Sequence, residues 1–235
     1  MGYGYTDEAL DIFPRYVLLE KVLNEIERYV PEDFSTFEEA KGIFRLILVD
    51  VRRESLKASE NKVEGLAICE EMAAISGFID DATERELLLV EPLFYRRVLS
   101  EQQSAFIWQN LSSRWGISDQ YWYPLSMDEP NNTEAFQDSY FEKEVDVAKI
   151  RELLGSRGVK NIYEMREHGP NYHLELTVFE PYYNGAEGYW FDDTYNWVFY
   201  ASHESSVTVS GWILQEIQAM WPNWKDRVWT TPFFE

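Results

Sequence analysis

The chain has 235 residues, of which 45% are hydrophobic and 27% charged, and this composition supports a folded core and excludes wholesale disorder. Acidic residues outnumber basic ones by 42 to 21, and the formal net charge of −21 disfavours direct binding to nucleic acid or to an anionic membrane. The single cysteine, Cys69, excludes an internal disulfide framework and indicates a reducing compartment. No apolar run approaches a membrane span and no secretory pattern is found at the start, so we expect a cytoplasmic protein.

Residues 1–88 are predicted to form a helical N-terminal region. Apolar residues recur at helical spacing over 10–30, which predicts a first helix. Ser35 or Thr36 is placed to cap a second helix, because acidic residues follow directly and an apolar face continues beyond them. A third helix is expected over 61–78.

Residues 89–235 are predicted to form an α+β domain, in which helices pack on one face of a mostly antiparallel sheet. Three helices are expected in it, opened or ended by serine, glycine and proline signals. Apolar and polar residues alternate in the predicted strands, and short Gly-Pro or Asn-Gly turns follow some of them. The helices are expected at 100–115, 147–154 and 212–221, and the strands at 162–166, 173–179, 197–201 and 206–209.

The segment from Asp128 to Asp146 is polar, acidic and rich in turn formers. It is predicted to be a long surface loop with one short helical turn. Its aromatic residues, Phe136, Tyr140 and Phe141, are set among the acids, a composition that favours binding to a partner over chemistry.

The segment over 179–193 carries six aromatic residues and four acidic ones with no basic residue. Aromatic side chains supply rigid contact area and acidic ones select cationic partners, so this segment predicts a surface that binds a basic protein. The alternative is a pair of hairpin strands whose aromatic rings belong to the core. The predicted contact residues are Glu180, Tyr182, Tyr183, Glu187, Tyr189, Trp190, Asp192 and Asp193.

The three histidines all lie in the predicted sheet region and provide an alternative site. His168 and His173 flank a Gly-Pro turn and His203 follows a predicted strand. With nearby carboxylates they could form a metal site or an acid/base pair, although their spacing matches no zinc motif and they could equally hydrogen-bond backbone at strand ends. The carboxylates considered are Glu164, Glu167, Glu175 and Glu204.

From Leu93 onward the sequence resembles a group of bacterial proteins that we associate with immunity proteins of polymorphic or contact-dependent toxin systems. The similar stretches are FYRRVLSEQQ, RWG followed by YWYPL, IYEMREHGPNYHLEL, EPYYNGAEGYW and NWVFYASHESSVTVSGW. The resemblance covers roughly the last 140 residues. It implies neutralisation of a toxin by binding, and it implies no catalytic residues.

The sequence therefore favours a non-enzymatic acidic binding protein, of which an immunity protein that masks the positively charged site of a basic toxin domain is the leading interpretation. The expected partner is a basic protein, with no cofactor, nucleic acid or membrane. Two alternatives remain: a metal-dependent hydrolase that uses the histidines and glutamates, and a two-part adaptor whose helical and sheet regions bind different partners.

Overall fold

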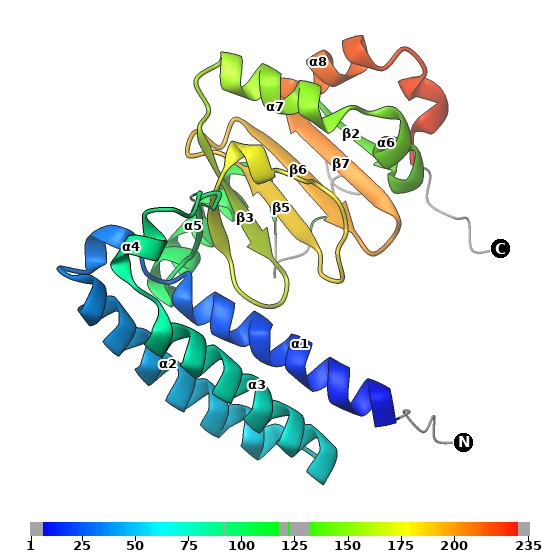
Figure 1. Cartoon of the computed structure of the whole chain (residues 1–235). Coiled ribbons are helices and arrows are strands. Elements are labelled where there is room, and N and C mark those ends of the chain that lie inside the picture. The colour runs from blue at the N-terminus through cyan, green and yellow to red at the C-terminus, as the bar shows by residue number, and fades with distance from the viewer. Residues whose placement is uncertain (1–6, 92, 118–121, 123–131, 230–235) are drawn as a thin grey trace. The chain divides into compact units, whose positions relative to one another are not determined.

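The computed structural model describes residues 7–91, 93–117, 122 and 132–229. The chain divides into two compact units, Met1–Leu93 and Phe94–Glu235. The protein is α+β, as predicted: helices come first in the chain and a seven-stranded antiparallel sheet follows (Figure 1). Across the described ranges, no helix has both the length and the apolar character that crossing a membrane requires.

The N-terminal unit is built from three long helices, α1 (Asp7–Ile26), α2 (Phe37–Ala58) and α3 (Lys62–Asp81). Capping side chains set the starts of α2 and α3, as the sequence predicts for α2: Thr36 accepts a hydrogen bond from the backbone of Glu39 at 3.1 Å, and Asn61 caps α3. A single 3₁₀ turn, η1 (Pro31–Asp33), precedes α2, and the short α4 (Glu84–Leu87) follows α3. The buried side chains between the helices are Leu18, Val22, Leu48, Val51, Ile68, Met72 and Ile79.

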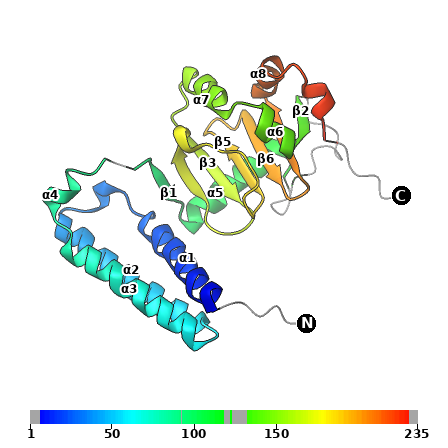
Figure 2. The same cartoon turned by 45° about the vertical axis from the view of Figure 1, so that its right-hand side comes forward.

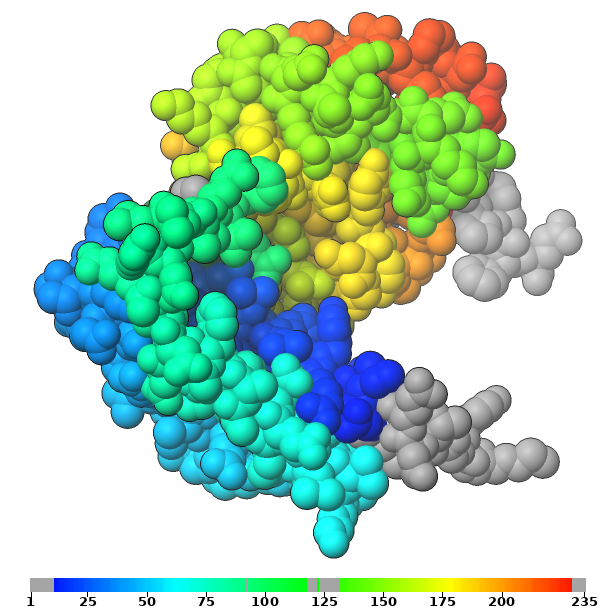
Figure 3. Space-filling model, viewed as in Figure 1, coloured from blue at the N-terminus to red at the C-terminus, as the bar shows by residue number. Residues whose placement is uncertain are grey.

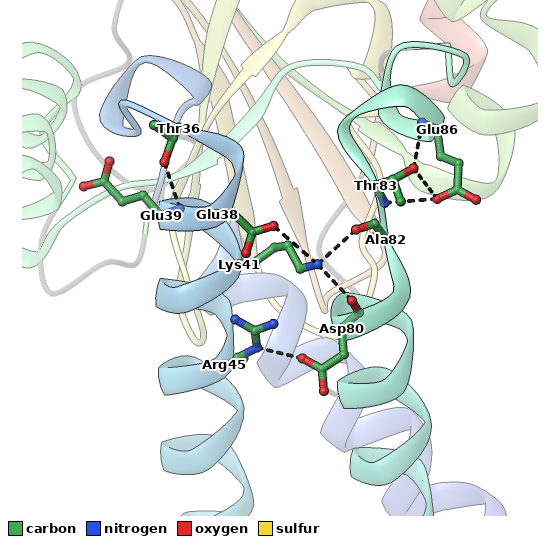
Figure 4. A network of polar contacts seen from close by, with 9 residues as sticks. All are labelled: Thr36, Glu38, Glu39, Lys41, Arg45, Asp80, Ala82, Thr83 and Glu86. Atoms are coloured by element: carbon green, nitrogen blue, oxygen red, sulfur yellow. Dashed lines mark hydrogen bonds and ion pairs between the residues drawn. The ribbon is translucent and has the colours of Figure 1, made fainter.

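A buried lysine joins the start of α2 to the end of α3 (Figure 4). Lys41 is only 7% exposed, and its Nζ donates hydrogen bonds to the carbonyl oxygens of Asp80 at 2.9 Å and Ala82 at 3.0 Å. These carbonyls belong to the helix end, where no intrahelical donor remains and the helix dipole is negative. Arg45 adds an ion pair to the Asp80 side chain at 2.7 Å. The two helices are thus bonded at this end.

The C-terminal unit contains one sheet in the order β1-β4-β3-β5-β6-β7-β2, with every neighbouring pair antiparallel. Its edges are β1 and β2, and β5 and β6 lie inside it. The predicted strand over 173–179 is shorter in the structure, because it turns into a 3₁₀ helix, η2 (Leu176–Val178). The strands are β1 (Arg96–Val98), β2 (Thr133–Gln137), β3 (Asn161–Arg166), β4 (Tyr172–Glu175), β5 (Gly188–Phe191), β6 (Trp197–Ser202) and β7 (Ser206–Gly211).

Helices cover both faces of the sheet, which corrects the expectation of helices on one face only (Figures 1 and 2). The helix α5 (Glu101–Trp115) packs on one face, while α6 (Asp138–Glu144), α7 (Val147–Ser156) and α8 (Ile213–Met220) pack on the other. The cause is the apolar character of the inner strands: all residues of β5 and β6 are buried. A strand that is apolar on both faces needs a cover on each side.

The acidic segment that was predicted to be a surface loop is structured over 132–146, and the rest of that segment lies outside the described residues. It forms β2, which pairs with β7 at the sheet edge, and then α6. Phe136 and Phe141 are both 0% exposed and their rings stack with centroids 6.1 Å apart. Tyr140 is exposed and lies under the guanidinium of Arg227. The two phenylalanines therefore hold this segment in the core, despite the polar residues around them.

Substitution of Phe141 by alanine is expected to lower the free energy of unfolding of the C-terminal unit by about 3–5 kcal/mol, because a buried ring leaves a cavity. Phe106→Ala, on α5 with a ring that is 64% exposed, should cost less than about 1 kcal/mol. Urea denaturation followed by tryptophan fluorescence measures both, since all nine tryptophans follow residue 107. Equal losses in the two variants would contradict the assignment of this segment to the core.

Candidate functional site

Four of the eight residues predicted to contact a partner are buried, and for them the prediction of a surface position was wrong. The reason is the place of β5 in the sheet, between β3 and β6 and covered on both faces. The rings of this strand alternate between the two cores, in agreement with the alternative of core-forming hairpin strands. The buried four are Glu187, Tyr189, Trp190 and Asp192.

Asp192 has a local structural role immediately after β5. Its Oδ1 accepts hydrogen bonds from the backbone nitrogen of Thr194 at 3.0 Å and from the Thr194 hydroxyl at 2.5 Å. This is the geometry by which an aspartate shapes a turn, here the one that leads toward β6. Its neighbour Asp193 is exposed. At this turn the carboxylate of Asp193 is therefore exposed to solvent, whereas that of Asp192 is buried.

The other three predicted contact residues lie together between η2 and β5. Glu180 and Tyr183 are exposed, the latter by 42%, and Tyr182 is half-buried. Arg151 of α7 fixes the start of this segment: its guanidinium donates to the carbonyl oxygen of Phe179 at 2.7 Å and lies 3.5 Å from the carboxylate of Glu180. The segment is thus held against α7.

The two acidic, aromatic stretches of the sequence meet at Tyr182. The pKa of Tyr182 is raised, first by partial burial and then by the negative charges of Glu142 and Glu180, with a smaller contribution from Asp146. Glu142 belongs to α6 and Asp146 caps α7, and both precede β3 in the sequence, whereas Glu180 follows β4. Charges from two separate parts of the sequence therefore affect the pKa of Tyr182. Figure 3 shows the yellow-green atoms of the α6–α7 region beside the yellow atoms of the segment after β4. We call Glu142, Asp146, Glu180, Tyr182 and Tyr183 the Tyr182 surface.

A buried carboxylate with four donors lies at the start of β5. Glu187 is 1% exposed and accepts hydrogen bonds from the hydroxyls of Tyr200 and Ser202, the latter at 3.0 Å. Its Oε1 is 2.5 Å from Nδ1 of His203 and 3.4 Å from the backbone nitrogen of the same residue. Burial, and next the bonded Glu187 carboxylate, raise the pKa of Tyr200. A charge buried in this way is tolerated because it is fully hydrogen-bonded.

This cluster orients a histidine but supplies no activated nucleophile. His203 is mostly exposed, and its Nε2 lies 3.6 Å from the Glu204 carboxylate. In a catalytic triad a carboxylate binds Nδ1 of the histidine and a nucleophilic hydroxyl donates a hydrogen bond to Nε2. Glu187 and His203 supply the first of these two contacts. The hydroxyl of Ser202 donates to Glu187 instead, so its single proton is already committed. The sequence signal for the Glu187–His203 pair was absent, because it depends on the pairing of β5 with β6.

The three histidines lie in three different surroundings, which does not support the alternative metal site. His168 is beside Glu167, and His203 is beside Glu187. His173, in β4, is paired in register with Tyr163 of β3 and accepts or donates one hydrogen bond with Tyr95 at 3.2 Å. Among the residues that the structure describes, no group of three histidine, cysteine, aspartate or glutamate side chains could hold a metal ion.

His173 lines a cleft of about 340 Å³ on the α5 face of the sheet. Arg97 of β1 donates a hydrogen bond to Gln103 of α5 at 3.1 Å, and Tyr195, whose backbone φ is 53°, also lines the cleft. Burial, and then the positive charge of Arg97, lower the pKa of His173 against the opposing effect of Asp193. The sequence did not indicate this cleft, because its residues come from separate elements. The lining residues are Arg97, Leu99, Gln103, Phe106, Ile107, Tyr163, His173 and Tyr195.

In comparisons with protein families, curated proteins and solved structures, no match to this chain was found. The sequence resemblance to immunity proteins therefore stays a prediction.

Substitution of Glu187 by alanine is expected to lower the free energy of unfolding of the C-terminal unit by about 2–4 kcal/mol, because the buried hydroxyls of Tyr200 and Ser202 lose their acceptor. Glu187→Gln should cost less, since an amide oxygen still accepts. Glu204→Gln, at an exposed position, is the control and should change stability by no more than about 0.5 kcal/mol. Urea denaturation at neutral pH measures all three, and an unchanged Glu187→Ala variant would disprove the structural role of this carboxylate.

The Arg97→Gln variant is expected to raise the pKa of His173 toward its ordinary value of 6.5, because one source of repulsion for the imidazolium is removed. Arg97→Lys keeps the charge and should leave the pKa low. The lowered pKa also makes stability depend on pH. Because the unfolded chain binds the His173 proton at a higher pH than the folded chain, neutral His173 adds to the free energy of unfolding above pH 6.5, and this stabilisation is lost as the pH falls below 6.5. NMR titration of the His173 ring measures the pKa, and equal values in both variants would exclude the influence of Arg97.

Proposed function

We propose that this protein is a non-enzymatic binding protein that docks a basic protein partner on the Tyr182 surface. One arrangement carries the proposal: Glu180 and Tyr183 are exposed on either side of the half-buried Tyr182, in a segment that Arg151 of α7 holds, and the negative charges of Glu142 and Glu180 act on this tyrosine. The resemblance from Leu93 onward makes an immunity protein the specific form of the proposal. The partner is then a basic toxin domain whose positively charged site is covered by this acidic surface, in the cytoplasm of the cell that makes both.

The whole-molecule charge and the local surface act at different stages of such an encounter. The net charge of −21 attracts a cationic protein over long range and raises the association rate, an effect that salt screens. Tyr182 and Tyr183 provide amphipathic rings that a partner can bury, which slows dissociation. Because Arg151 holds the segment on α7, little backbone ordering has to accompany binding.

The variant Glu142→Lys/Glu180→Lys is expected to slow association with the cognate basic protein roughly tenfold at low salt and to reduce its salt dependence, because local attraction becomes repulsion. The matched control is Glu20→Lys/Glu54→Lys, two exposed positions of the N-terminal unit that give the same net charge. Biolayer interferometry at low and high NaCl measures both rates. Equal association rates for the two double variants would exclude the Tyr182 surface.

The partner to use as the probe is the purified basic product of a reading frame adjacent to the one that encodes this chain. Co-expression with this product should restore growth if the chain neutralises a toxin, and Tyr183→Ala should weaken the rescue by speeding dissociation. Phe106→Ala, which removes an exposed ring elsewhere in the unit, is the control. Failure of every basic neighbouring product to bind, or rescue that Tyr183→Ala and the charge reversals leave intact, would overturn the proposal.

A further inference from the structure

The N-terminal unit carries an apolar groove of about 480 Å³ at the end of the bundle where α2 begins and α3 ends. Side chains from α2, α3, α4 and the residues after α4 line it. Several of them are open to solvent: Phe78 is 76% exposed, and Leu87 and Val90 are exposed as well. A contiguous group of exposed apolar side chains is typical of a surface that binds a partner or a ligand. The apolar lining residues are Phe37, Ala40, Phe44, Phe78, Ile79, Ala82, Leu87 and Val90.

Lys41 is the only basic residue among the described residues that line the groove, and its ammonium group is already bonded within the N-terminal unit. Its Nζ donates to the carbonyl oxygens of Asp80 and Ala82 and lies 3.8 Å from the carboxylate of Glu38 (Figure 4). A ligand with a carboxylate, such as a fatty acid, would therefore have to displace bonds that hold α2 to α3. The groove offers an apolar floor without an available positive charge.

The rim of the groove is negatively charged. Asp81 and Glu86 line the groove itself, and the adjoining hollow is bordered by Glu38, Asp80 and Glu84. The last turn of α3 has no basic residue, so its two aspartates add to the negative end of the helix dipole. Hydrogen bonds from the side chain and backbone of Thr83 lower the pKa of Glu86 and hold this carboxylate at the start of α4.

Basic side chains offset this rim only in part. Lys41 and Arg45 are bonded within the unit, to the end of α3, and Arg85 is the further basic residue, on α4. Two of the five carboxylates, Glu38 and Asp80, are paired with Lys41 and Arg45. The other three, Asp81, Glu84 and Glu86, border the groove and the adjoining hollow against one further basic residue, Arg85. An occupant that matches this pattern has an apolar face flanked by positive charge.

We propose that this groove binds the apolar face of a cationic amphipathic helix from a partner protein. Such a helix places large apolar residues at i, i+3 or i+4 and i+7 in a groove and its lysines or arginines over an acidic rim. The groove lies wholly within Met1–Leu93, whereas the Tyr182 surface lies in Phe94–Glu235. The proposal therefore goes beyond the function proposed above and gives the chain a second, separate binding surface.

The test uses the full-length protein and a synthetic leucine/lysine peptide about four turns long, with its leucines on one helical face. Two control peptides accompany it: one of the same composition with the leucines shuffled around the helix, and one with glutamate in place of lysine. Fluorescence anisotropy of the labelled peptides is expected to show binding at least about tenfold tighter for the amphipathic cationic peptide than for either control. Equal binding of the shuffled peptide would overturn the proposal, because net charge alone would then explain it.

Phe78→Lys and Val90→Lys place a positive charge in the groove, and each is expected to weaken binding of the amphipathic peptide about tenfold. Both residues are exposed, so the fold should tolerate the change, and helical circular dichroism checks each variant. Leu46→Lys is the matched control. Leu46 lies on α2, its side chain is 66% exposed, as against 76% for Phe78 and 64% for Val90, and it does not line the groove. Equal losses in Leu46→Lys and the groove variants would overturn the proposal.

Neutralising the rim with Asp81→Asn/Glu84→Gln should weaken binding about threefold at low salt, while Glu20→Gln/Glu54→Gln should not. Other occupants give distinct results. Displacement of the peptide by palmitate would assign the groove to a lipid, and a dimer that sediments as such and is lost in Phe78→Lys would assign it to a second copy. Either result would overturn the proposal of a cationic helix.

Discussion

The burial of β5 and β6 on both faces is the constraint on which the C-terminal unit depends. Two inner strands with no polar face require α5 on one side and α6, α7 and α8 on the other. The aromatic rings of β5 and β6 are buried in these two cores, so Tyr189 and Trp190 cannot contact a partner. What the unit can offer to a partner must then come from turns, helix ends and edges, and the Tyr182 surface is of this kind.

The distribution of charge follows from the same constraint. Carboxylates are excluded from the doubly covered strands, and the two buried at their borders are hydrogen-bonded: Glu187 by hydroxyl, imidazole and backbone donors, and Asp192 by the backbone and hydroxyl of Thr194. Many of the other described acidic residues lie on the exterior of the two units. At the Tyr182 surface they flank tyrosines, and at the end of the three-helix bundle they border an apolar groove. Both arrangements pair negative charge with apolar area, and both therefore favour cationic, amphipathic partners.

Local patterns predicted local structure well. The cap at Ser35 or Thr36 and the helix over 100–115 are decided by a few neighbouring residues, and the structure confirms them: Thr36 caps α2, Ser100 caps α5, and α5 ends at Gly116, which is left-handed. The sequence position of Phe136 and Phe141 could not reveal their burial, because β2 pairs with β7, about 70 residues later in the chain. For the same reason the Glu187–His203 pair and the His173 cleft were out of reach: each is assembled by strand order, which periodicity does not determine.

The strand order has a consequence for how the chain acquires its fold during synthesis. The first strands to leave the ribosome, β1 and β2, are the two outermost strands, and the pair that completes the centre, β5 and β6, emerges late. The three-helix bundle can form from contacts among neighbouring helices while the sheet still lacks its middle. Until β7 has been made, the aromatic strands have no partner on one side, and this interval is when a chaperone would protect the nascent polypeptide from aggregation.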